Sequence, residues 1–498
     1  MDLDGNSRPQ PICNPWESRS MPWPDKMEHR DDGAIAAPGW AALLSGGNAV
    51  RSLTLAGGVA LHATNVFVAT TIMPSVVKDI GGLPYYAWNT TAFVVLSILG
   101  SSLSTKLLRI AGPRGAYAVA AILFGLGSLI CAVAPSMAVF LVGRSLQGFG
   151  GGLMLAFAYA MIRLVFHESL WPRAITVVSG MWGVATLAGP AIGGVFAEWG
   201  AWRAAFWTLV ALSALFALLA GIVLPKRNAG QSAGSRLPGV QLVLLVAAVL
   251  ALSAGSIARE TLWSIAGVVG AVLFVAWLTR VERHSANRMF PADAFKPVSR
   301  LFALYATMAL LEVTVTPGEV FVPLFFQVLH GQPPLVAGYL AAIIGGGWTV
   351  GSIMSSGASG GEDVRYILAS PILACAGMAV LTVLAPMAGS NGWAVLVPIC
   401  GALACVGFGI GIAWPHLLSR VLKAVPTDEQ DVASASLTTL QLFATALGAA
   451  TAGMVANLAG LANPGGVIGI SHAALWLFAS FAVAPALAIM TARRGTRI

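Results

Sequence analysis

The chain contains a succession of apolar stretches, each about as long as a helix must be to cross a lipid bilayer. A membrane-spanning helix needs about 20 mostly apolar residues, and this rule predicts about fourteen spans in the sequence. The predicted spans lie near residues 52–77, 86–108, 115–135, 137–163, 173–197, 203–225, 237–257, 261–280, 301–328, 334–357, 365–387, 392–418, 432–459 and 467–491. The expected fold class is therefore an all-α polytopic membrane protein.

The composition supports a membrane protein and argues against a soluble one. Hydrophobic residues make up 57% of the 498 residues and charged residues only 10%, whereas a soluble domain is typically about 25% charged. The net charge of +8 comes from basic residues in short loops, without a basic domain or interleaved aromatic residues. We therefore expect the lipid bilayer, and no nucleic acid, as a partner.

The basic residues also predict an orientation. Loops rich in Lys and Arg face the cytoplasm. With fourteen spans, Lys78, Arg203 and Arg259 fall on one side, Arg144 falls inside a span, and all other basic residues fall on the side of the two termini. We expect both termini in the cytoplasm and the chain in the cell inner (plasma) membrane.

The order of the spans predicts two six-helix bundles joined by two extra linker helices. Such paired halves with a site near the midplane are a common transporter plan. The expected divisions are a disordered cytoplasmic tail at 1–49, an N-terminal bundle at 50–226, a linker with the two extra helices at 227–299, a C-terminal bundle at 300–492 and a cytoplasmic tail at 493–498.

The fifth predicted span, "SGMWGVATLAGPAIGGVFAEW", combines Gly189 and Pro190 with Gly193 and Gly194. Proline kinks a helix, and glycines let a second helix approach closely. In this combination the stretch resembles the antiporter motif of the major facilitator superfamily, although two earlier glycines of that motif are absent. The glycines alone would also suit ordinary helix packing.

The fourth predicted span begins "LVGRSLQGFGGGLM", and its Arg144, Gln147 and Gly148 match the R-x-x-Q-G motif of the same superfamily. An arginine inside a span is costly, so we expect it to face a cavity or an acidic partner. The alternative is an arginine near a helix end whose charge reaches the membrane surface.

Three further stretches, "EWGAWRAAFW", "FVPLFFQVLHGQPPLVAGYLAAI" and "VERHSANRMFPADAF", are similar to the fourteen-span drug:proton antiporter branch of that superfamily. The resemblance covers the chain from about residue 50 to residue 492. It implies the major facilitator fold and proton-driven export of small molecules.

The chain departs from the branch at two places. The first span usually carries an aspartate where this sequence has His62. In the loop after the second span, Gly112 and Arg114 fit the conformational motif of the superfamily, but Arg109 stands where an acid is usual. The acid-based clasp between helices is therefore not expected in its usual form.

Two glutamates lie within the ninth apolar run, "ALLEVTVTPGEVFVPLFF". Glu312 and Glu319 are seven residues apart, which places them on one helical face about 10 Å apart along the axis. Pro317 and Gly318 between them can open the helix locally, which requires protein or water nearby. The resemblance implies that this helix lines the transport cavity.

A poorly hydrated site favours the neutral form of a carboxyl group, so that it can exchange a proton near neutral pH. We predict that Glu312 is the principal proton-coupling residue, with Glu319 accessory and His62 a further candidate. The alternatives are that one glutamate pairs with Arg144, that Glu319 lies near the outer surface, and that His62 is a packing residue.

Candidate residues for the substrate cavity are Arg144, Gln147, Asn65, Trp348 and Trp414. The indole rings of Trp348 and Trp414 could stack on a flat or cationic ligand. The alternative is that they pack in the core or anchor the protein at the membrane interface. We expect an exporter of amphipathic or cationic small molecules. An exporter of one metabolite, lipid or siderophore on the same fold is the alternative, and a membrane-embedded enzyme or a sensor is a further one.

No nucleotide-binding motif, nucleophile elbow or metal-ligand spacing occurs in the sequence. The five cysteines include no CxxC pair and are interpreted as small core residues. We therefore expect no metal, no cofactor and no enzymatic activity, and we expect a monomer whose ligands are a small molecule and protons.

Overall fold

The computed structural model describes residues 40–224, 237–258, 260–358, 361–389 and 392–497, and within them all regular secondary structure is helical. The helices are α1 (Trp40–Leu43), α2 (Gly46–Ile80), α3 (Trp88–Ala132), α4 (Met137–Val165), α5 (Trp171–Glu198), α6 (Trp202–Val223), α7 (Gly239–Ser256), α8 (Thr261–His284), α9 (Arg300–Val328), α10 (Pro334–Ser355), α11 (Glu362–Leu384), α12 (Trp393–Ala424), α13 (Gln430–Leu458), α14 (Gly466–Phe481) and α15 (Val483–Thr496), with single 3-10 turns η1 (Leu83–Tyr85), η2 (Glu168–Leu170) and η3 (Thr427–Glu429).

Thirteen helical stretches in the described residues are long and apolar enough to cross a membrane. One of them, α3, is 45 residues long and consists of two helices that meet at Gly112. The left-handed φ of 67° at Gly112, followed by Pro113, turns the chain there; a glycine adopts such an angle without a steric penalty. With α3 taken as two spans, the structure agrees with the predicted number of about fourteen.

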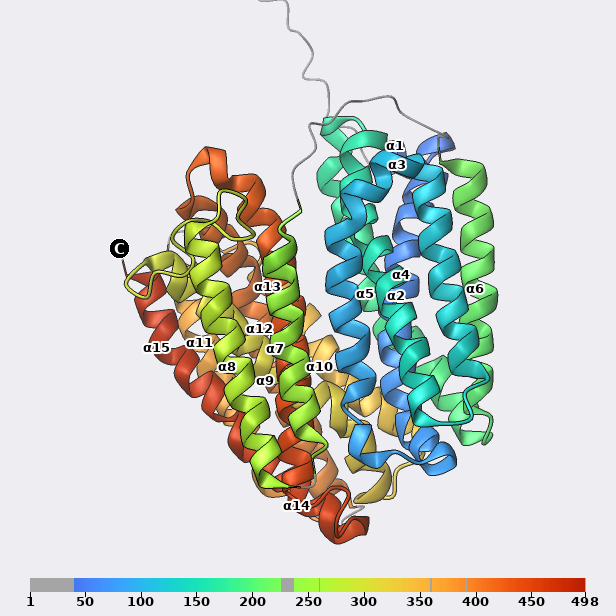
Figure 1. Cartoon of the computed structure of the whole chain (residues 1–498), viewed down its shortest axis with the longest axis vertical. Helices are drawn as coiled ribbons and strands as arrows, with labels where there is room; N and C mark the ends of the chain where they lie inside the picture. The colour runs from blue at the N-terminus through green and yellow to red at the C-terminus, as the bar shows by residue number, and fades with distance from the viewer. Residues whose placement is uncertain (1–39, 225–236, 259, 359–360, 390–391, 498) are drawn as a thin grey trace, which may run out of the picture.

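The helices form two groups that lie side by side (Figure 1). Helices α2 to α6 pack together, and α9 to α15 form the second group. The extra helices α7 and α8 pack against each other, and α7 also contacts α13 of the second group and α3 of the first. We call these groups the first and the second bundle.

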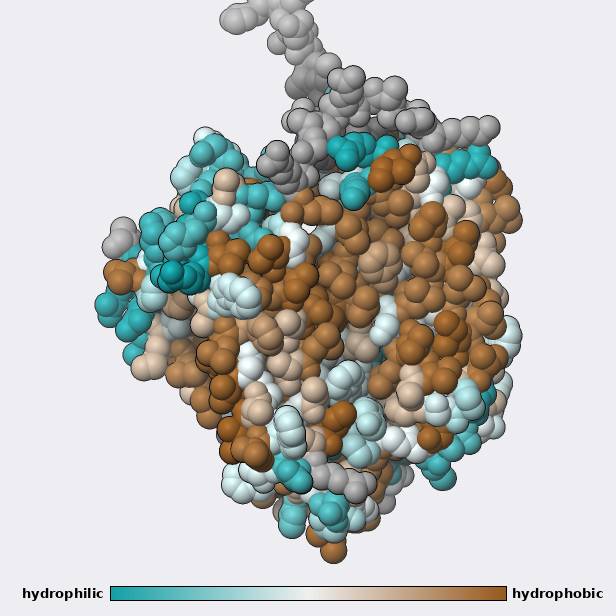
Figure 2. Space-filling model, viewed as in Figure 1, coloured by the Kyte–Doolittle hydropathy of each residue, from teal (hydrophilic) through white to brown (hydrophobic). Residues whose placement is uncertain are grey.

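The outer surface supports a membrane-spanning arrangement. Figure 2 shows a broad apolar zone around the middle of the molecule and hydrophilic residues gathered towards its two ends. Large apolar side chains are exposed within the spans, for example Leu218, Ile222 and Val272. Exposed apolar side chains of this kind are stable when lipid rather than water surrounds them.

The predicted tails are only partly outside the helices. Residues 1–39 of the predicted N-terminal tail lie outside the described residues, as do residues 225–236 of the linker. Within 40–49, however, the chain forms α1 and the start of α2, and the Asn48 side chain donates to the Ala42 carbonyl across their junction. At the other terminus α15 continues to Thr496, into the predicted tail at 493–498.

The two bundles are joined mainly towards one end of the molecule, which we call the closed end. Four hydrogen bonds between the bundles lie there or near it: Gln327 to the Thr71 carbonyl, the Leu335 amide to Glu198, Tyr339 to the Leu187 carbonyl, and Asn457 to the Pro84 carbonyl. Helix α1 and the last turn of α15 lie towards the opposite end (Figure 1). The bundles are therefore held together on the side away from the described ends of the chain.

Candidate functional site

Glu312 is a buried carboxyl group in the middle of α9. Its side chain is 5% exposed. One carboxyl oxygen accepts a hydrogen bond of 2.8 Å from the Thr445 hydroxyl of α13, while the second has no hydrogen-bond partner among the described residues. Gln441, one turn before Thr445, is also close enough to interact with this carboxyl group. The Glu312 carboxyl group is therefore held by α13, a helix other than its own.

The helix that carries Glu312 is continuous. Pro317 and Pro323 lie inside α9, yet the helix runs unbroken from residue 300 to residue 328. A proline removes one backbone donor, and nearby threonine hydroxyls bond to other carbonyls of α9: Thr314 to Leu310 and Thr316 to Glu312. The predicted local opening at Pro317 and Gly318 is therefore absent from this conformation.

Glu319 follows two turns after Glu312 and differs from it in exposure. Glu312 is buried, whereas Glu319 is partly exposed. The two carboxyl groups are near enough to interact electrostatically. That Glu312 lies deeper in the membrane than Glu319 stays a prediction.

Arg144 of α4 is a buried cation, 2% exposed, held by neutral acceptors. Its guanidinium donates to the Gln147 side-chain oxygen at 2.7 Å, to the Asn65 side-chain oxygen at 3.0 Å and to the Asn89 carbonyl at 3.4 Å. The guanidinium carbon lies 4.5 Å from the ring centre of Phe93, which gives a cation–π contact.

These acceptors connect three helices of the first bundle. Asn65 belongs to α2, Asn89 and Phe93 to α3, and Gln147 to α4. Gln147 continues the network by donating to the Ser128 hydroxyl at 2.8 Å. In the described part of the chain Arg144 forms no ion pair with Glu312 or Glu319, so the alternative that one of them pairs with Arg144 is wrong for this conformation.

His62 lies near this network and is 2% exposed. Its ring centre is 5.2 Å from that of Phe93 and 6.0 Å from that of Trp182. Its Nδ1 atom has no hydrogen-bond partner among the described residues. These contacts favour the packing interpretation of His62.

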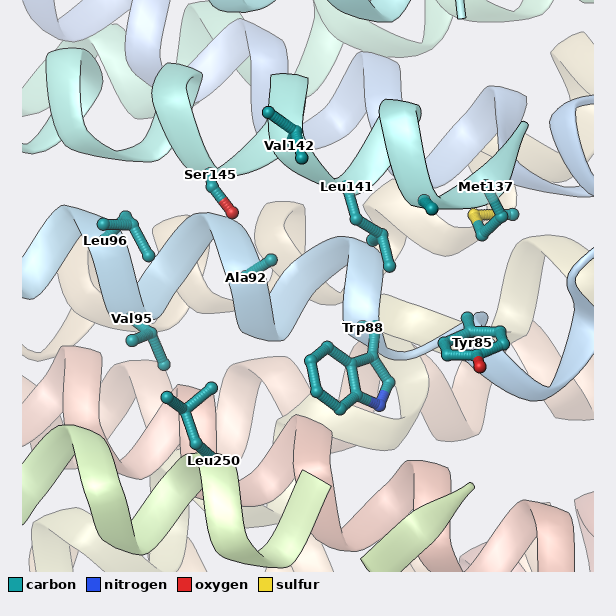
Figure 3. Close-up of a pocket in the computed structure, with 11 residues that line it drawn as sticks. Tyr85, Trp88, Ala92, Val95, Leu96, Met137, Leu141, Val142, Ser145 and Leu250 are labelled. Atoms are coloured by element: carbon teal, nitrogen blue, oxygen red, sulfur yellow. The ribbon is translucent and has the colours of Figure 1, made fainter. Parts of the chain in front are cut away.

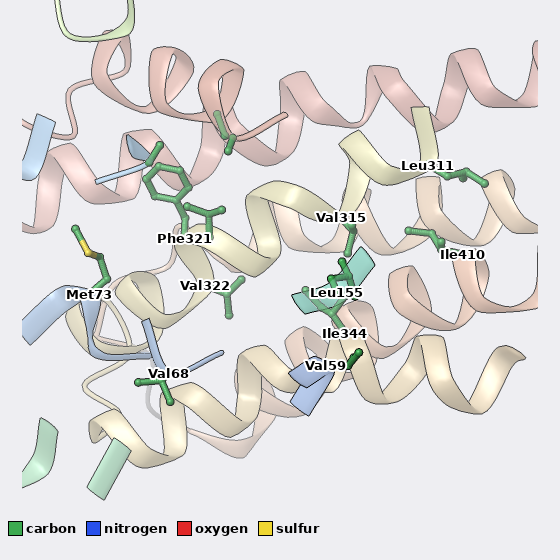
Figure 4. Close-up of a cluster of buried hydrophobic side chains, with 14 of the residues drawn as sticks. Val59, Val68, Met73, Leu155, Leu311, Val315, Phe321, Val322, Ile344 and Ile410 are labelled. Carbon is green, nitrogen blue, oxygen red and sulfur yellow. The ribbon is translucent and has the colours of Figure 1, made fainter. Parts of the chain in front are cut away.

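An apolar cluster of side chains from both bundles fills the centre of the molecule. It includes Val59 and Leu155 from the first bundle and Val315 and Ile344 from the second, and Figure 4 shows these side chains near one another. Because all four are less than 7% exposed, they close the space between the bundles at this level.

The glycines of α5 bring three helices into close contact. A methyl group in place of the Gly189 hydrogen would lie 2.3 Å from Phe67 Cβ, and one at Gly193 would lie 3.0 Å from the Val68 carbonyl oxygen of α2. At Gly194 it would lie 2.4 Å from Leu335 Cα of α10. Pro190 also approaches α10, at Gly338. This motif therefore lies where the two bundles meet at the closed end.

Gly112 and Arg114, the two residues that fit the conformational motif of the superfamily, are placed differently within α3. Gly112 makes the turn within α3 described above. Arg114 begins the second half of α3 and approaches α6 at Gly221, about 3.8 Å from a methyl group built there. Arg114 thus lies at the junction of α3 with α6, within the first bundle.

Trp348 of α10 and Trp414 of α12 form an edge-to-face pair with ring centres 5.0 Å apart. Both are only partly buried. The structure brings these two predicted cavity residues together in the second bundle, and it brings Asn65, Gln147 and Arg144 together in the first.

Two residues that complete these sites were not predicted. Thr445 positions the Glu312 carboxyl group, and Phe93 contacts both Arg144 and His62. Thr and Phe are common in membrane spans, so nothing in the sequence distinguishes these two. The described residues contain no group of three or more His, Cys, Asp or Glu side chains that could hold a metal ion.

Comparison with known sequences gives the family. Residues 55–449 match the model of the Major Facilitator Superfamily. A probable multidrug-efflux transporter of Mycobacterium tuberculosis is 37% identical over 458 residues, covering 89% of this chain and 94% of that protein. Multidrug resistance protein 3 of Bacillus subtilis is 24% identical, over 80% of this chain and 77% of that protein.

Solved transporter structures share the fold. A crystal structure of a POT family transporter in complex with 5-aminolevulinic acid matches with a TM-score of 0.65 and 12% identity, covering 90% of this chain and 97% of that one. A D-xylose-proton symporter matches with a TM-score of 0.60 and 15% identity, covering 88% and 96%. The chain, a multi-pass membrane protein with this fold, belongs to the Major Facilitator Superfamily.

Proposed function

We propose that this protein is a proton-driven efflux antiporter that exports amphipathic or cationic small molecules. Its similarity to a probable multidrug-efflux transporter over nearly the whole of both chains supports the class of substrate. The observation that carries the proton-coupled part is Glu312, a buried carboxyl group within a membrane span with one oxygen unpaired.

In the proposed cycle Glu312 exchanges its proton when water reaches the carboxyl group. In this conformation the Thr445 hydroxyl holds one oxygen, and the carboxyl group is buried away from water. The carboxyl group adjoins Gln441 and Thr445 of α13, which are both partly exposed. From the carboxyl group, these two residues lie in the direction away from the closed end. Protonation then stabilises one state of the transporter relative to the other.

The test is substrate-driven proton movement in proteoliposomes with the variant Glu312→Gln. Glutamine keeps the size of the side chain and can still accept from Thr445, but it cannot release a proton. We expect proton movement to fall to the background level and uphill export to stop, while downhill exchange of substrate continues.

Glu319→Gln is the matched control, because it makes the same chemical change two turns along the same helix. We expect this variant to keep proton coupling and to weaken transport of cationic substrates more than that of neutral ones. Wild-type coupling in Glu312→Gln, or loss of coupling in Glu319→Gln alone, would contradict the assignment.

We further propose that the protein is a monomer in the cell inner membrane with both termini in the cytoplasm. The distribution of basic residues supports this orientation, and it places the closed end outside. The proposed domain division is the one given above, with bundles at 50–226 and 300–492. Reporter fusions after residues 230 and 290 should both report cytoplasm; a signal from outside at either position would overturn the fourteen-span topology.

A substrate panel in an efflux-deficient host, with and without a protonophore, tests the breadth of transport. Protection against several unrelated lipophilic cations that disappears with the protonophore is the expected result. Protection against a single compound would instead indicate an exporter of a specific metabolite, lipid or siderophore.

A further inference from the structure

The last turn of the extra helix α7 is bonded to side chains from both bundles. The final carbonyl groups of a helix lack partners within that helix, and in a membrane span they must find partners in other parts of the protein. In α7 the Ser253 carbonyl accepts from the Trp88 indole of α3 at 3.1 Å. The Ser256 carbonyl accepts from the Asn457 side-chain amide of α13 at 2.8 Å.

Asn457 also reaches directly across to the first bundle. The same amide nitrogen donates to the Pro84 carbonyl, in η1 just before α3, at 2.8 Å. Helix α3, helix α7 and helix α13 therefore meet at one junction at the closed end, through Trp88, Asn457 and three backbone carbonyl groups.

Apolar contacts extend this junction along α7. Val94 and Val95 of α3, Val249 and Leu252 of α7, and Met454 of α13 belong to one buried cluster. The contacts of α7 with α13 and α8 are more extensive than its contacts with α3. Helix α7 is therefore expected to move with the second bundle when the two bundles separate.

We propose that α7 is part of the gate at the closed end and that Trp88 and Asn457 form its latch. When the bundles separate there, two hydrogen bonds must break: Trp88 to the Ser253 carbonyl and Asn457 to the Pro84 carbonyl. This gives the first extra helix a function in the conformational cycle. The inference goes beyond the proposed function, because it concerns the equilibrium between two conformations and not the substrate or the proton.

The geometry allows the latch to open without leaving buried groups of α7 unpaired. After Trp88 leaves, the Ser253 carbonyl still accepts from the Ser256 hydroxyl at 2.6 Å. After Pro84 leaves, the Asn457 amide still donates to the Ser256 carbonyl within the second bundle. An unpaired buried carbonyl group would raise the free energy of the open state and oppose opening. Because the carbonyl groups of α7 keep a partner, the two hydrogen bonds can break and form again reversibly.

Trp88 also has space beside it. A cavity of about 350 Å³ lies between α3, α4 and α7, lined by Trp88, Tyr85, Met137, Leu141 and Leu250 among others. Figure 3 shows the Trp88 side chain projecting from α3 towards the side on which α7 and Leu250 lie. The indole can therefore change orientation without displacing a packed core.

The test is the distance between spin labels at the closed end, measured by double electron–electron resonance in a background without native cysteines. Labels at Val133 of the first bundle and Val467 of the second suit this measurement, since both positions are exposed. The variants are Trp88→Phe, which keeps a ring but removes the donor, and Asn457→Leu, which keeps the approximate size. Each should raise the ratio of open to closed molecules about fivefold, as expected for the loss of one neutral hydrogen bond.

The matched control is Trp171→Phe. Trp171 also donates its indole N–H to a backbone carbonyl, that of Phe166 at 3.0 Å, but within the first bundle. This variant should leave the distance distribution unchanged. The proposal is overturned if neither Trp88→Phe nor Asn457→Leu changes the distribution, or if Trp171→Phe changes it equally.

Discussion

Arg144 illustrates how a single charge is accommodated inside this membrane protein. The cation lies in a cage of three neutral oxygen acceptors and one aromatic ring. Placing an arginine in a membrane span costs about 3 kcal/mol even on insertion scales, and these contacts offset that cost without an acid. The cage also links α2, α3 and α4, so the charge has a structural role in addition to any contact with substrate.

We predict that Arg144→Ala loses more than tenfold in transport and that Arg144→Lys keeps part of it. Alanine leaves the Asn65 side-chain oxygen without its donor and the Gln147 side-chain oxygen with only the weak Cys131 thiol donor, at a cost of about 1–3 kcal/mol for a buried polar group. Lysine keeps the positive charge but lacks the planar guanidinium group with its several N–H donors. Transport rates and melting temperatures of the purified variants measure both effects; wild-type values for Arg144→Ala would show that the cage is dispensable.

At the scale of single helices, α5 shows why small residues recur in this chain. A methyl group would lie 2.3 Å from α2 at Gly189 and 2.4 Å from α10 at Gly194, and at Gly193 it would make a tight contact of 3.0 Å with α2, whereas Gly180, on the same helix, has nothing within 4 Å of a built methyl group. Glycine is therefore needed at some positions of α5 and not at others. The helix makes most of the contacts of the first bundle with α10 of the second, and α2 makes the others.

We predict that Gly189→Leu and Gly193→Leu abolish transport although the protein still inserts into the membrane. A leucine would force α2 away from α5 at a cost of about 1–3 kcal/mol or more, as overpacking does. Gly180→Leu is the control on the same helix and should transport normally. Membrane insertion and transport of the three variants are compared; normal transport in Gly189→Leu and Gly193→Leu would make the close contact irrelevant to function.

For the molecule as a whole, the closed end holds the two bundles in one relative position. Its contacts lie on both sides of the interface, with α5 against α10 on one side and α3 against α13 and α7 on the other. Transporters of this plan alternate between states by moving one half against the other around a central site. The contacts at the closed end must therefore break in every cycle.

A disulfide across the closed end should stop transport reversibly. A methyl group built at Gly453 of α13 lies 2.8 Å from Ala87 Cβ beside α3. This is about 1 Å shorter than the Cβ separation of about 3.8 Å in a disulfide, so the two segments must move apart slightly for the bond to form. In a background without native cysteines, we expect Ala87→Cys with Gly453→Cys to lose transport on oxidation and to regain it with a reductant. Each single variant should be insensitive to oxidation; unimpaired transport by the oxidised pair would mean that this end never opens.

The sequence by itself determined the fold class, the approximate number of spans and the family. Each of these depends on patterns along the chain: the length of an apolar run is set by the bilayer, and the glycine, proline and arginine motifs lie within single spans. The two glutamates of α9 could also be identified as candidate functional residues from the sequence, because charged residues are rare in apolar runs of this length.

Only the tertiary structure decided which residues contact one another. It paired Glu312 with Thr445, which is 133 positions away, and it enclosed Arg144 among neutral oxygens where an acidic partner was one of the expected alternatives. It also placed α7 at the junction of both bundles, through the indole of Trp88 and the amide of Asn457. Such contacts depend on how helices far apart in the sequence pack together, and periodicity within one helix carries no information about the neighbour that it will meet.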